Sequence, residues 1–199
     1  MALVINHNLS SLTAQRNLSN TGRSLGKAFE RVSSGLRVNS AADDAAGLGV
    51  AENLEAASRS ARVAMRNTND GISVVQTAEG ATSEVGNILK RMRELAVQSS
   101  SETLDTTERG YIQDEFTALT AEVDRIAQVT EFNGLNLTDG TSNTSLAIQV
   151  GVNNTANDRI SITMGDLTSS TLGVGTTQMS LNSVASAQSA ITDLDTALN

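Results

Sequence analysis

The chain contains no proline, cysteine or tryptophan, and its 199 residues include one histidine, one tyrosine and three phenylalanines. The lack of cysteine excludes a disulfide framework, thiolate zinc sites and a cysteine nucleophile. Aromatic side chains normally supply large buried areas, so a deep compact core is hard to assemble here. The core must be built from Leu, Ile, Val and Ala, which favours thin layers of helices packed through aliphatic stripes.

Acidic side chains prevail, with 22 Asp and Glu against 14 Lys and Arg and a net charge of -8. This balance argues against nucleic-acid phosphates and against an anionic membrane surface as partners. Residues 1–66 nevertheless carry +3, while residues 67–138 carry -7 and residues 139–199 carry -4. Such a distribution can pair subunits or halves of the chain, and solvated helix faces are the alternative. The first residues also lack the basic region and apolar run of a secretory signal, and no run approaches the ~20 apolar residues of a membrane span.

The first apolar stripe is thin and interrupted by glycines. Its spacings of 4, 3 and 7 indicate one helix face, with a phase shift after the third member. Gly22, Gly26 and Gly35 weaken this helix, because each glycine costs about 1 kcal/mol relative to alanine. We therefore expect the segment to become ordered only against a partner. The stripe consists of Ile5, Leu9, Leu12, Leu18, Leu25, Phe29, Val32 and Leu36.

A second, longer stripe alternates steps of 3 and 4, close to the coiled-coil repeat of 3.5. A helix over residues 41–99 would be about 88 Å long at 1.5 Å per residue, far beyond an ordinary globular helix. The sequence thus predicts a helical rod. The stripe consists of Ala61, Met65, Thr68, Ile72, Val75, Ala78, Thr82, Val85, Leu89, Met92 and Ala96.

A third stripe, from Ile112 to Thr130, predicts a helix antiparallel to the second, with the turn at residues 99–104. Asp105 and Glu108 have the spacing of a capping box at its start. Asn133-Gly134 is expected to end this helix.

Residues 138–182 are rich in Thr, Ser, Asn and Gly, and two alternating segments, 146–150 and 159–164, predict one β-hairpin with a long loop. A lone hairpin is marginal in water, so it should lie on the helices. A fourth helical stripe begins at Val184 and reaches Leu198 without a cap. We expect the chain to be the N-terminal part of a longer protein.

No catalytic or metal-binding constellation is present in the sequence. His7 is the only histidine, which leaves two-histidine metal sites and a charge-relay triad without members. Asp43 and Asp44 are adjacent and would point about 100° apart on a helix, so a helix start or a salt bridge suits them better than paired acid and base. The glycine pairs at 47/49 and 173/175 lack the frame of a dinucleotide loop. We expect no enzyme, no cofactor and no metal.

Several blocks of the sequence resemble bacterial flagellin in the expected order. They are residues 5–15 (INHNLSSLTAQ), 24–47 (SLGKAFERVSSGLRVNSAADDAAG), 67–81 (NTNDGISVVQTAEGA), 92–99 (MRELAVQS) and 132–134 (FNG). The resemblance implies a mainly α fold, a long antiparallel coiled-coil-like rod with a small β-hairpin. It also implies a domain order of residues 1–42 for the filament-core segment, 43–137 for the rod, 138–182 for hairpin and loop, and 183–199 for the start of a truncated core helix.

The resemblance further implies a non-enzymatic subunit that is exported unfolded through a type III channel and assembles with other flagellin subunits into the extracellular filament for swimming motility. Expected partners are the filament cap and the hook–filament junction proteins. The family's return helix has no counterpart here, so the export-chaperone site should be missing. Self-assembly would use Ile5, Leu9, Leu12, Leu18, Leu25, Phe29, Val32 and Leu36.

Some flagellins are recognised by Toll-like receptor 5, and the matching positions here are Arg91, Leu95 and Glu115. Arg91 and Leu95 are four residues apart and would share a helix face, giving a charged contact beside an apolar one. An ordinary solvated edge is the alternative for these residues. For the whole chain the alternatives are a hook–filament junction protein, a flagellin fragment used as a receptor ligand, and a secreted enzyme on a flagellin scaffold.

Overall fold

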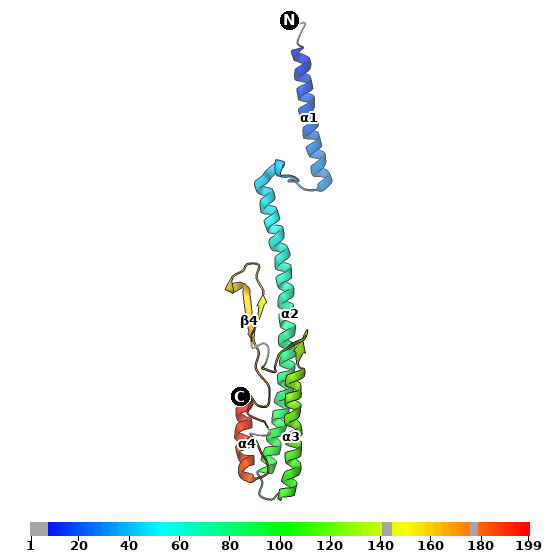
Figure 1. The fold of residues 1–199 in the computed structure, drawn as a ribbon. Helices are drawn as coiled ribbons and strands as arrows, with labels where there is room; N and C mark the ends of the chain where they lie inside the picture. The colour runs from blue at the N-terminus through cyan, green and yellow to red at the C-terminus, as the bar shows by residue number, and fades with distance from the viewer. Residues whose placement is uncertain (1–7, 141–144, 176–178) are drawn as a thin grey trace. The chain divides into compact units, whose positions relative to one another are not determined.

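The structure, a computed structural model, describes residues 8–140, 145–175 and 179–199. Its helices are α1 (Leu9–Ser34), α2 (Ala41–Ser99), α3 (Thr106–Val129) and α4 (Val184–Ala197) (Figure 1). Its strands are β1 (Glu131–Phe132), β2 (Leu135–Asn136), β3 (Ser145–Gln149) and β4 (Arg159–Thr163), with a short 3-10 turn, η1, at Ala156–Asp158. The mainly helical class with small antiparallel strands is confirmed. The chain divides into two compact units, Met1–Ser60 and Ala61–Asn199.

The first unit holds α1 and the beginning of α2. The side chain of Asn8 caps α1 by accepting from the backbone N–H of Ser11 at 3.0 Å. Gly35 ends the helix in the left-handed conformation (φ 71°), which glycine adopts without a side-chain penalty. The expected bounds of α2 are confirmed, but Asp44 is non-helical (φ -165°), and its carboxylate accepts from the N–H of Gly47 at 2.8 Å. The regular part of α2 therefore starts at Asp44, which acts as an N-cap.

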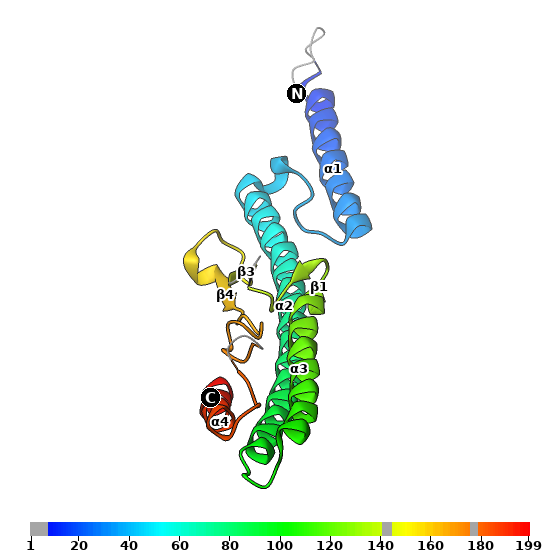
Figure 2. The same cartoon turned by 60° about the horizontal axis from the view of Figure 1, so that its bottom comes forward.

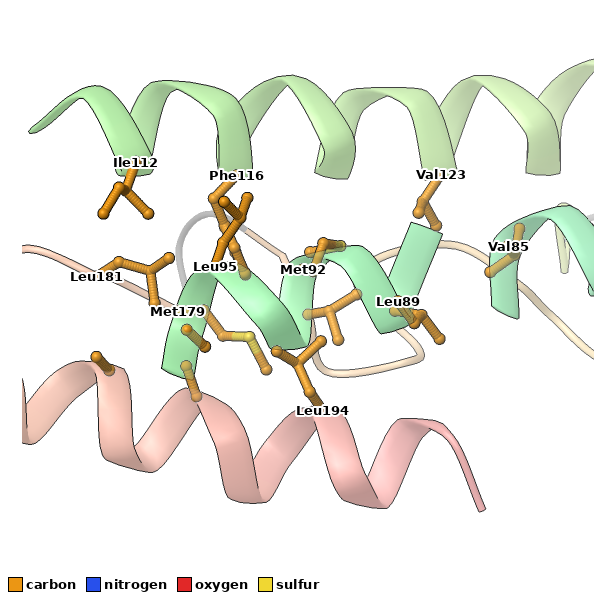
Figure 3. Close-up of a cluster of buried hydrophobic side chains, with 14 residues drawn as sticks. Val85, Leu89, Met92, Leu95, Ile112, Phe116, Val123, Met179, Leu181 and Leu194 are labelled. Atoms are coloured by element: carbon orange, nitrogen blue, oxygen red, sulfur yellow. The ribbon is translucent and has the colours of Figure 1, made fainter. Parts of the chain in front are cut away.

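The core of the second unit lies where α2 passes between α3 and α4 (Figure 3). α3 folds back along α2 after the turn at residues 100–105 (Figure 2). The predicted capping box is confirmed: Asp105 accepts from the N–H groups of Thr107 and Glu108, and Glu108 accepts from the N–H of Asp105. Phe116 is the one aromatic side chain in this otherwise aliphatic core, as the composition indicated. Core side chains labelled in the figure are Val85, Leu89, Met92, Leu95, Ile112, Phe116, Val123, Met179, Leu181 and Leu194.

The prediction that Asn133-Gly134 ends the third helix is wrong. α3 ends at Val129, where the N–H and the hydroxyl of Thr130 both donate to the carbonyl of Ile126. Asn133 and Gly134 instead form the two-residue turn between β1 and β2, with φ of 51° and 77°. Asn-Gly with two positive φ values is the preferred pair for the tight hairpin turn whose twist matches that of the strands.

The predicted hairpin at 146–164 is confirmed as the β3–β4 pair, in which Ile148 lies opposite Ile160. It rests on α2 at Gly71, where an added Cβ would lie 2.2 Å from Cδ1 of Ile148. Asn67 donates its amide N–H to the carbonyl of Gln149 at 3.2 Å beside this contact. The lack of a side chain at position 71 therefore leaves room for the end of the Ile148 side chain.

The predicted apolar stripe of α2 is confirmed only in its C-terminal half. From Val85 onward its members are buried, whereas Met65 is 61% and Ile72 is 50% exposed. A straight helix drifts by about 20° per heptad from a 3.5-residue repeat, so one stripe cannot face the same side over 36 residues. Close to the hairpin, the buried side of α2 carries small residues instead: Ala64, Gly71, Val74 and Ala81.

The segment before α4 is fixed to α2 and α3 through its backbone. The hydroxyl of Ser99 donates to the carbonyl of Leu181 at 2.6 Å, and the N–H of Leu181 donates to the side chain of Gln113 at 2.6 Å. Arg93 of α2 pairs with Asp195 of α4 at 2.6 Å. The predicted fourth helix is confirmed, and these contacts hold it against α2.

Candidate functional site

The apolar side chains predicted for self-assembly are exposed in the first unit. Residues 9–34, which the structure describes in full, include no buried residue. Leu36 follows the cap residue Gly35 and is 59% exposed, while Ile5 lies outside the described residues. The exposed fractions within α1 are 71% for Leu9, 45% for Leu12, 75% for Leu18, 56% for Leu25, 66% for Phe29 and 82% for Val32.

These side chains do not share one helix face, so that part of the prediction is wrong. α1 is regular from end to end and has no irregularity that could absorb the phase shift. Leu9 and Leu18 are nine residues apart, which is about two and a half turns at 3.6 residues per turn. Leu9 and Leu12 (the N-terminal pair) therefore lie nearly opposite Leu18, Leu25, Phe29 and Val32 (the C-terminal row).

The connection between α1 and α2 folds back on the end of α1. Nζ of Lys27 donates to Oδ1 of Asp43 at 3.2 Å, and the Asp43 side chain is only 8% exposed. The Asn39 side chain donates to the hydroxyl of Ser34 at 2.9 Å and to the carbonyl of Glu30 at 3.4 Å. The hydrogen bond from Lys27 is the main cause that lowers the pKa of Asp43 below its usual value. Asp43 thus serves in a salt bridge, which was one of the two roles expected for it.

A second exposed cluster lies on α2 and α3 at the predicted receptor residues. Arg91 donates from Nη2 to Oε1 of Glu115 at 2.7 Å and from Nη1 to Oε2 of Glu94 at 3.0 Å. The hydrogen bond with Glu115, followed by that with Glu94, raises the pKa of the Arg91 guanidinium. The side chains of Arg91 and Glu115 are about half exposed, at 50% and 45%. The two charged residues are therefore together at the surface.

Leu95 does not lie beside them as a surface contact. Its side chain is 1% exposed and packs in the core between α2, α3 and α4 (Figure 3). Arg91 and Leu95 are one turn plus about 40° apart on the helix, and this offset is enough to carry the leucine under α3 and α4. The expectation of an exposed apolar contact at this position is wrong for the chain as it stands.

An apolar groove between α2 and the β3–β4 hairpin was not anticipated from the sequence. Its volume is about 490 Å³, and its lining includes Ile72 and Val75 on the helix and Ile148, Ile160 and Ile162 on the hairpin. The helix residues of this groove, Ile72 and Val75, were recognised in the sequence as members of the apolar stripe of α2. The stripe was expected to be buried along its whole length, so no groove was predicted there.

Within residues 8–140, 145–175 and 179–199, no group of three or more Asp, Glu or His side chains is placed to hold a metal ion. Among the same residues, no helix is both long and apolar enough to cross a membrane. His7, the only histidine, lies outside the described residues.

Comparison with known proteins finds similarity over most of the chain. Residues 5–144 match the family model described as the bacterial flagellin N-terminal helical region. Flagellin B of Vibrio cholerae serotype O1 is 44% identical over 175 residues, which are 88% of this chain and 46% of that protein. Flagellin of Halalkalibacterium halodurans is 44% identical over 193 residues, which are 97% of this chain and 70% of that protein. The chain thus spans about half the length of the Vibrio relative.

Among solved structures, the crystal structure of Bacillus cereus flagellin is similar with a TM-score of 0.58 and 33% sequence identity. The match covers 67% of this chain and 74% of that one.

Proposed function

The chain belongs to the bacterial flagellin family, and on that premise we propose that it is a structural, non-enzymatic part of the filament subunit that assembles with further copies outside the cell. The observation that carries this proposal is the exposure of every large apolar side chain of α1. Burying one Leu or Phe side chain gains about 1.5–3 kcal/mol, so contacts between copies provide a substantial driving force. Folding of α1 is then coupled to assembly, which guards against premature polymerisation.

The test is growth of filaments from short flagellar seeds, followed by electron microscopy. The wild-type chain is expected to elongate the seeds. The Leu25→Ser/Phe29→Ser variant should not, because both side chains are exposed on α1 and unpaired within the unit. Tyr111→Ser on α3, whose side chain is 70% exposed, is the matched control and should grow as the wild type does. Absence of growth by the wild type would refute the proposal.

The length of the polymer that grows on the seed distinguishes the proposed function from its main alternative. A hook–filament junction protein would form a short zone on the seed, whereas a filament subunit forms long homopolymers. The filament cap and the junction proteins are the further partners that this proposal implies, together with secretion through the type III channel.

Recognition by Toll-like receptor 5 is a second candidate function, and the exposed Arg91–Glu115 pair favours it. Arg91 presents its guanidinium at the surface between two carboxylates, in a geometry suited to exchange one of them for a receptor group. Arg91→Ala should reduce receptor signalling, and the Arg125→Ala variant, which breaks the exposed pair with Glu122, should not. Equal signalling by all three proteins would refute this assignment. Leu95→Ala is unsuitable as a test because it opens the core.

A further inference from the structure

The turn between β1 and β2 places a side-chain amide next to a backbone nitrogen that carries no side chain. Asn133 and Gly134 are both exposed, and an added Cβ at Gly134 would have open space around it. Among the residues that the structure describes, no group accepts a hydrogen bond from the N–H of Gly134, and none binds the side-chain amide of Asn133. Both groups are therefore open to water and to reaction with each other.

We propose that this turn is a site of spontaneous covalent modification, at which the chain converts its own Asn133 into aspartate and isoaspartate. The deprotonated backbone nitrogen of Gly134 attacks Cγ of Asn133 and forms a new N–C bond, while the bond between Cγ and Nδ2 breaks. Nδ2 leaves as ammonia and takes up a proton in place of the one that the Gly134 nitrogen lost. Water then adds to either carbonyl of the five-membered ring, which opens to aspartate or to isoaspartate. Water is the co-reactant, and no atom is oxidised or reduced.

Two properties of the turn decide how fast this reaction runs. Asn133 is the one asparagine in the sequence that is followed by glycine, whose lack of a Cβ lets the nitrogen approach Cγ closely. A hairpin turn with two positive φ values has ψ of about 30° at its first residue, which turns the Gly134 nitrogen away from Cβ of Asn133. The turn must therefore open before the ring closes. Because each strand contributes only two residues, local opening does not require the rest of the unit to unfold.

The modification changes both the charge and the backbone of the β1–β2 hairpin. Asn133 and Asp70 line the same cavity of about 400 Å³ beside α2, so a carboxylate formed at position 133 adds a second negative charge to it. Like charges that share a site repel each other. Isoaspartate also lengthens the backbone by one atom next to the Phe132–Leu135 pair and so disturbs the pairing of the strands. The modified chain is therefore more acidic, and its β1–β2 hairpin is weaker.

Incubation of the full 199-residue chain at neutral and at mildly alkaline pH tests this inference. Released ammonia is measured over time, and peptides are analysed by mass spectrometry with fragmentation that locates the modified residue. The wild type should release one ammonia per chain as Asn133 is converted, and both aspartate and isoaspartate should appear at this position. The rate should rise in proportion to the hydroxide concentration, because the attacking nitrogen is the deprotonated one. Asn136 and Asn153, which no glycine follows, should keep their amides over the same period.

Two variants complete the test. Asn133→Asp lacks the leaving group and suits the same turn, so it should release no ammonia and should match the modified wild type in charge on ion exchange. Asn153→Asp makes the same charge change at an exposed position between β3 and β4, and it should release ammonia at the wild-type rate.

Two results would overturn the inference. If Asn133 keeps its amide as long as Asn153 does in the wild type, the folded turn protects it. If Asn133→Asp releases as much ammonia as the wild type, the reacting asparagine lies elsewhere in the chain. Neither result bears on filament assembly, so the proposed function is tested separately.

Discussion

Arg109 is predicted to be the most sensitive charged residue of the second unit. Arg109 is 7% exposed as a residue, and its guanidinium donates to three backbone carbonyls, those of Ser99, Leu104 and Ser101, around the turn between α2 and α3. The carbonyls at the end of α2 have no partners within the helix, and the negative end of the helix dipole also favours a cation there. One side chain therefore holds the end of α2, the turn and the start of α3 together.

The magnitude follows from these hydrogen bonds. A hydrogen bond to a charged group contributes about 1.5–3 kcal/mol to the free energy of unfolding. Without the guanidinium, water would hydrogen-bond to some of the three carbonyls at the end of the helical layer and so offset part of the loss. Arg109→Ala should therefore lower the free energy of unfolding by about 3 kcal/mol, which for a unit of this size is roughly 10 °C in melting temperature. The free energy of unfolding of Arg109→Lys should lie between those of the wild type and Arg109→Ala, because an ammonium group lacks the planar fork of donors that reaches three carbonyls.

Thermal and urea unfolding followed by circular dichroism provide the measurement. Arg125→Ala is the matched control, because Arg125 is an exposed arginine of the same helix whose partner Glu122 lies one turn away. Such exposed pairs contribute little, so the control should melt with the wild type. If Arg109→Ala melts within about 1 °C of Arg125→Ala, the three carbonyls are satisfied without the guanidinium, and the reasoning is refuted.

Three further predictions concern the hairpin, the link to α4 and the first unit. Gly71→Ala should destabilise the second unit by about 1 kcal/mol relative to Gly80→Ala in the same urea titration, since the added Cβ at position 71 would displace the end of the Ile148 side chain, whereas position 80 has open space around it. Ser99→Ala should cost about 1–3 kcal/mol by leaving the buried carbonyl of Leu181 without its hydroxyl donor, again by urea unfolding. The pKa of Asp43 is lowered in the folded chain, so its contribution to stability is present above the ordinary aspartate value of 3.8 and is lost as the pH falls through the folded value. Carboxyl NMR of Asp43 should titrate below 3.8 in the wild type and move upward in Lys27→Met, and an unchanged midpoint would contradict the role of Lys27.

Local signals in the sequence were sufficient for most of the fold. The capping box at Asp105, the alternation in the β3 and β4 segments and the bounds of α2 all depend on residues close together in the chain. The buried residues of the long helix α2 were harder to predict, because burial along α2 depends on which neighbouring element lies beside each turn. The hairpin selects small residues near Gly71, and this selection arises from a contact with Ile148 that is distant in sequence.

The candidate surfaces were likewise only partly predictable from local sequence. The glycines and the thin stripe led to the prediction that the α1 segment becomes ordered only against a partner, which stays a prediction, and the structure shows the large apolar side chains of this segment exposed. These side chains could be assigned to two sides of the helix only once it was known that α1 continues without a break through the phase shift. Leu95 was misplaced because a spacing of four residues brings side chains near one another but does not decide which of them a third helix covers.

The two units use similar aliphatic residues in opposite ways. In the second unit, Leu89, Leu181 and Leu194 are at most 3% exposed, and backbone hydrogen bonds to Ser99 and Gln113 fix the segment that carries one of them. In the first unit, the described leucines of α1 remain in solvent, and one ion pair and one amide side chain hold the helix end. Since every large apolar side chain of α1 is exposed, substitutions there should alter the proposed assembly without altering the stability of the second unit.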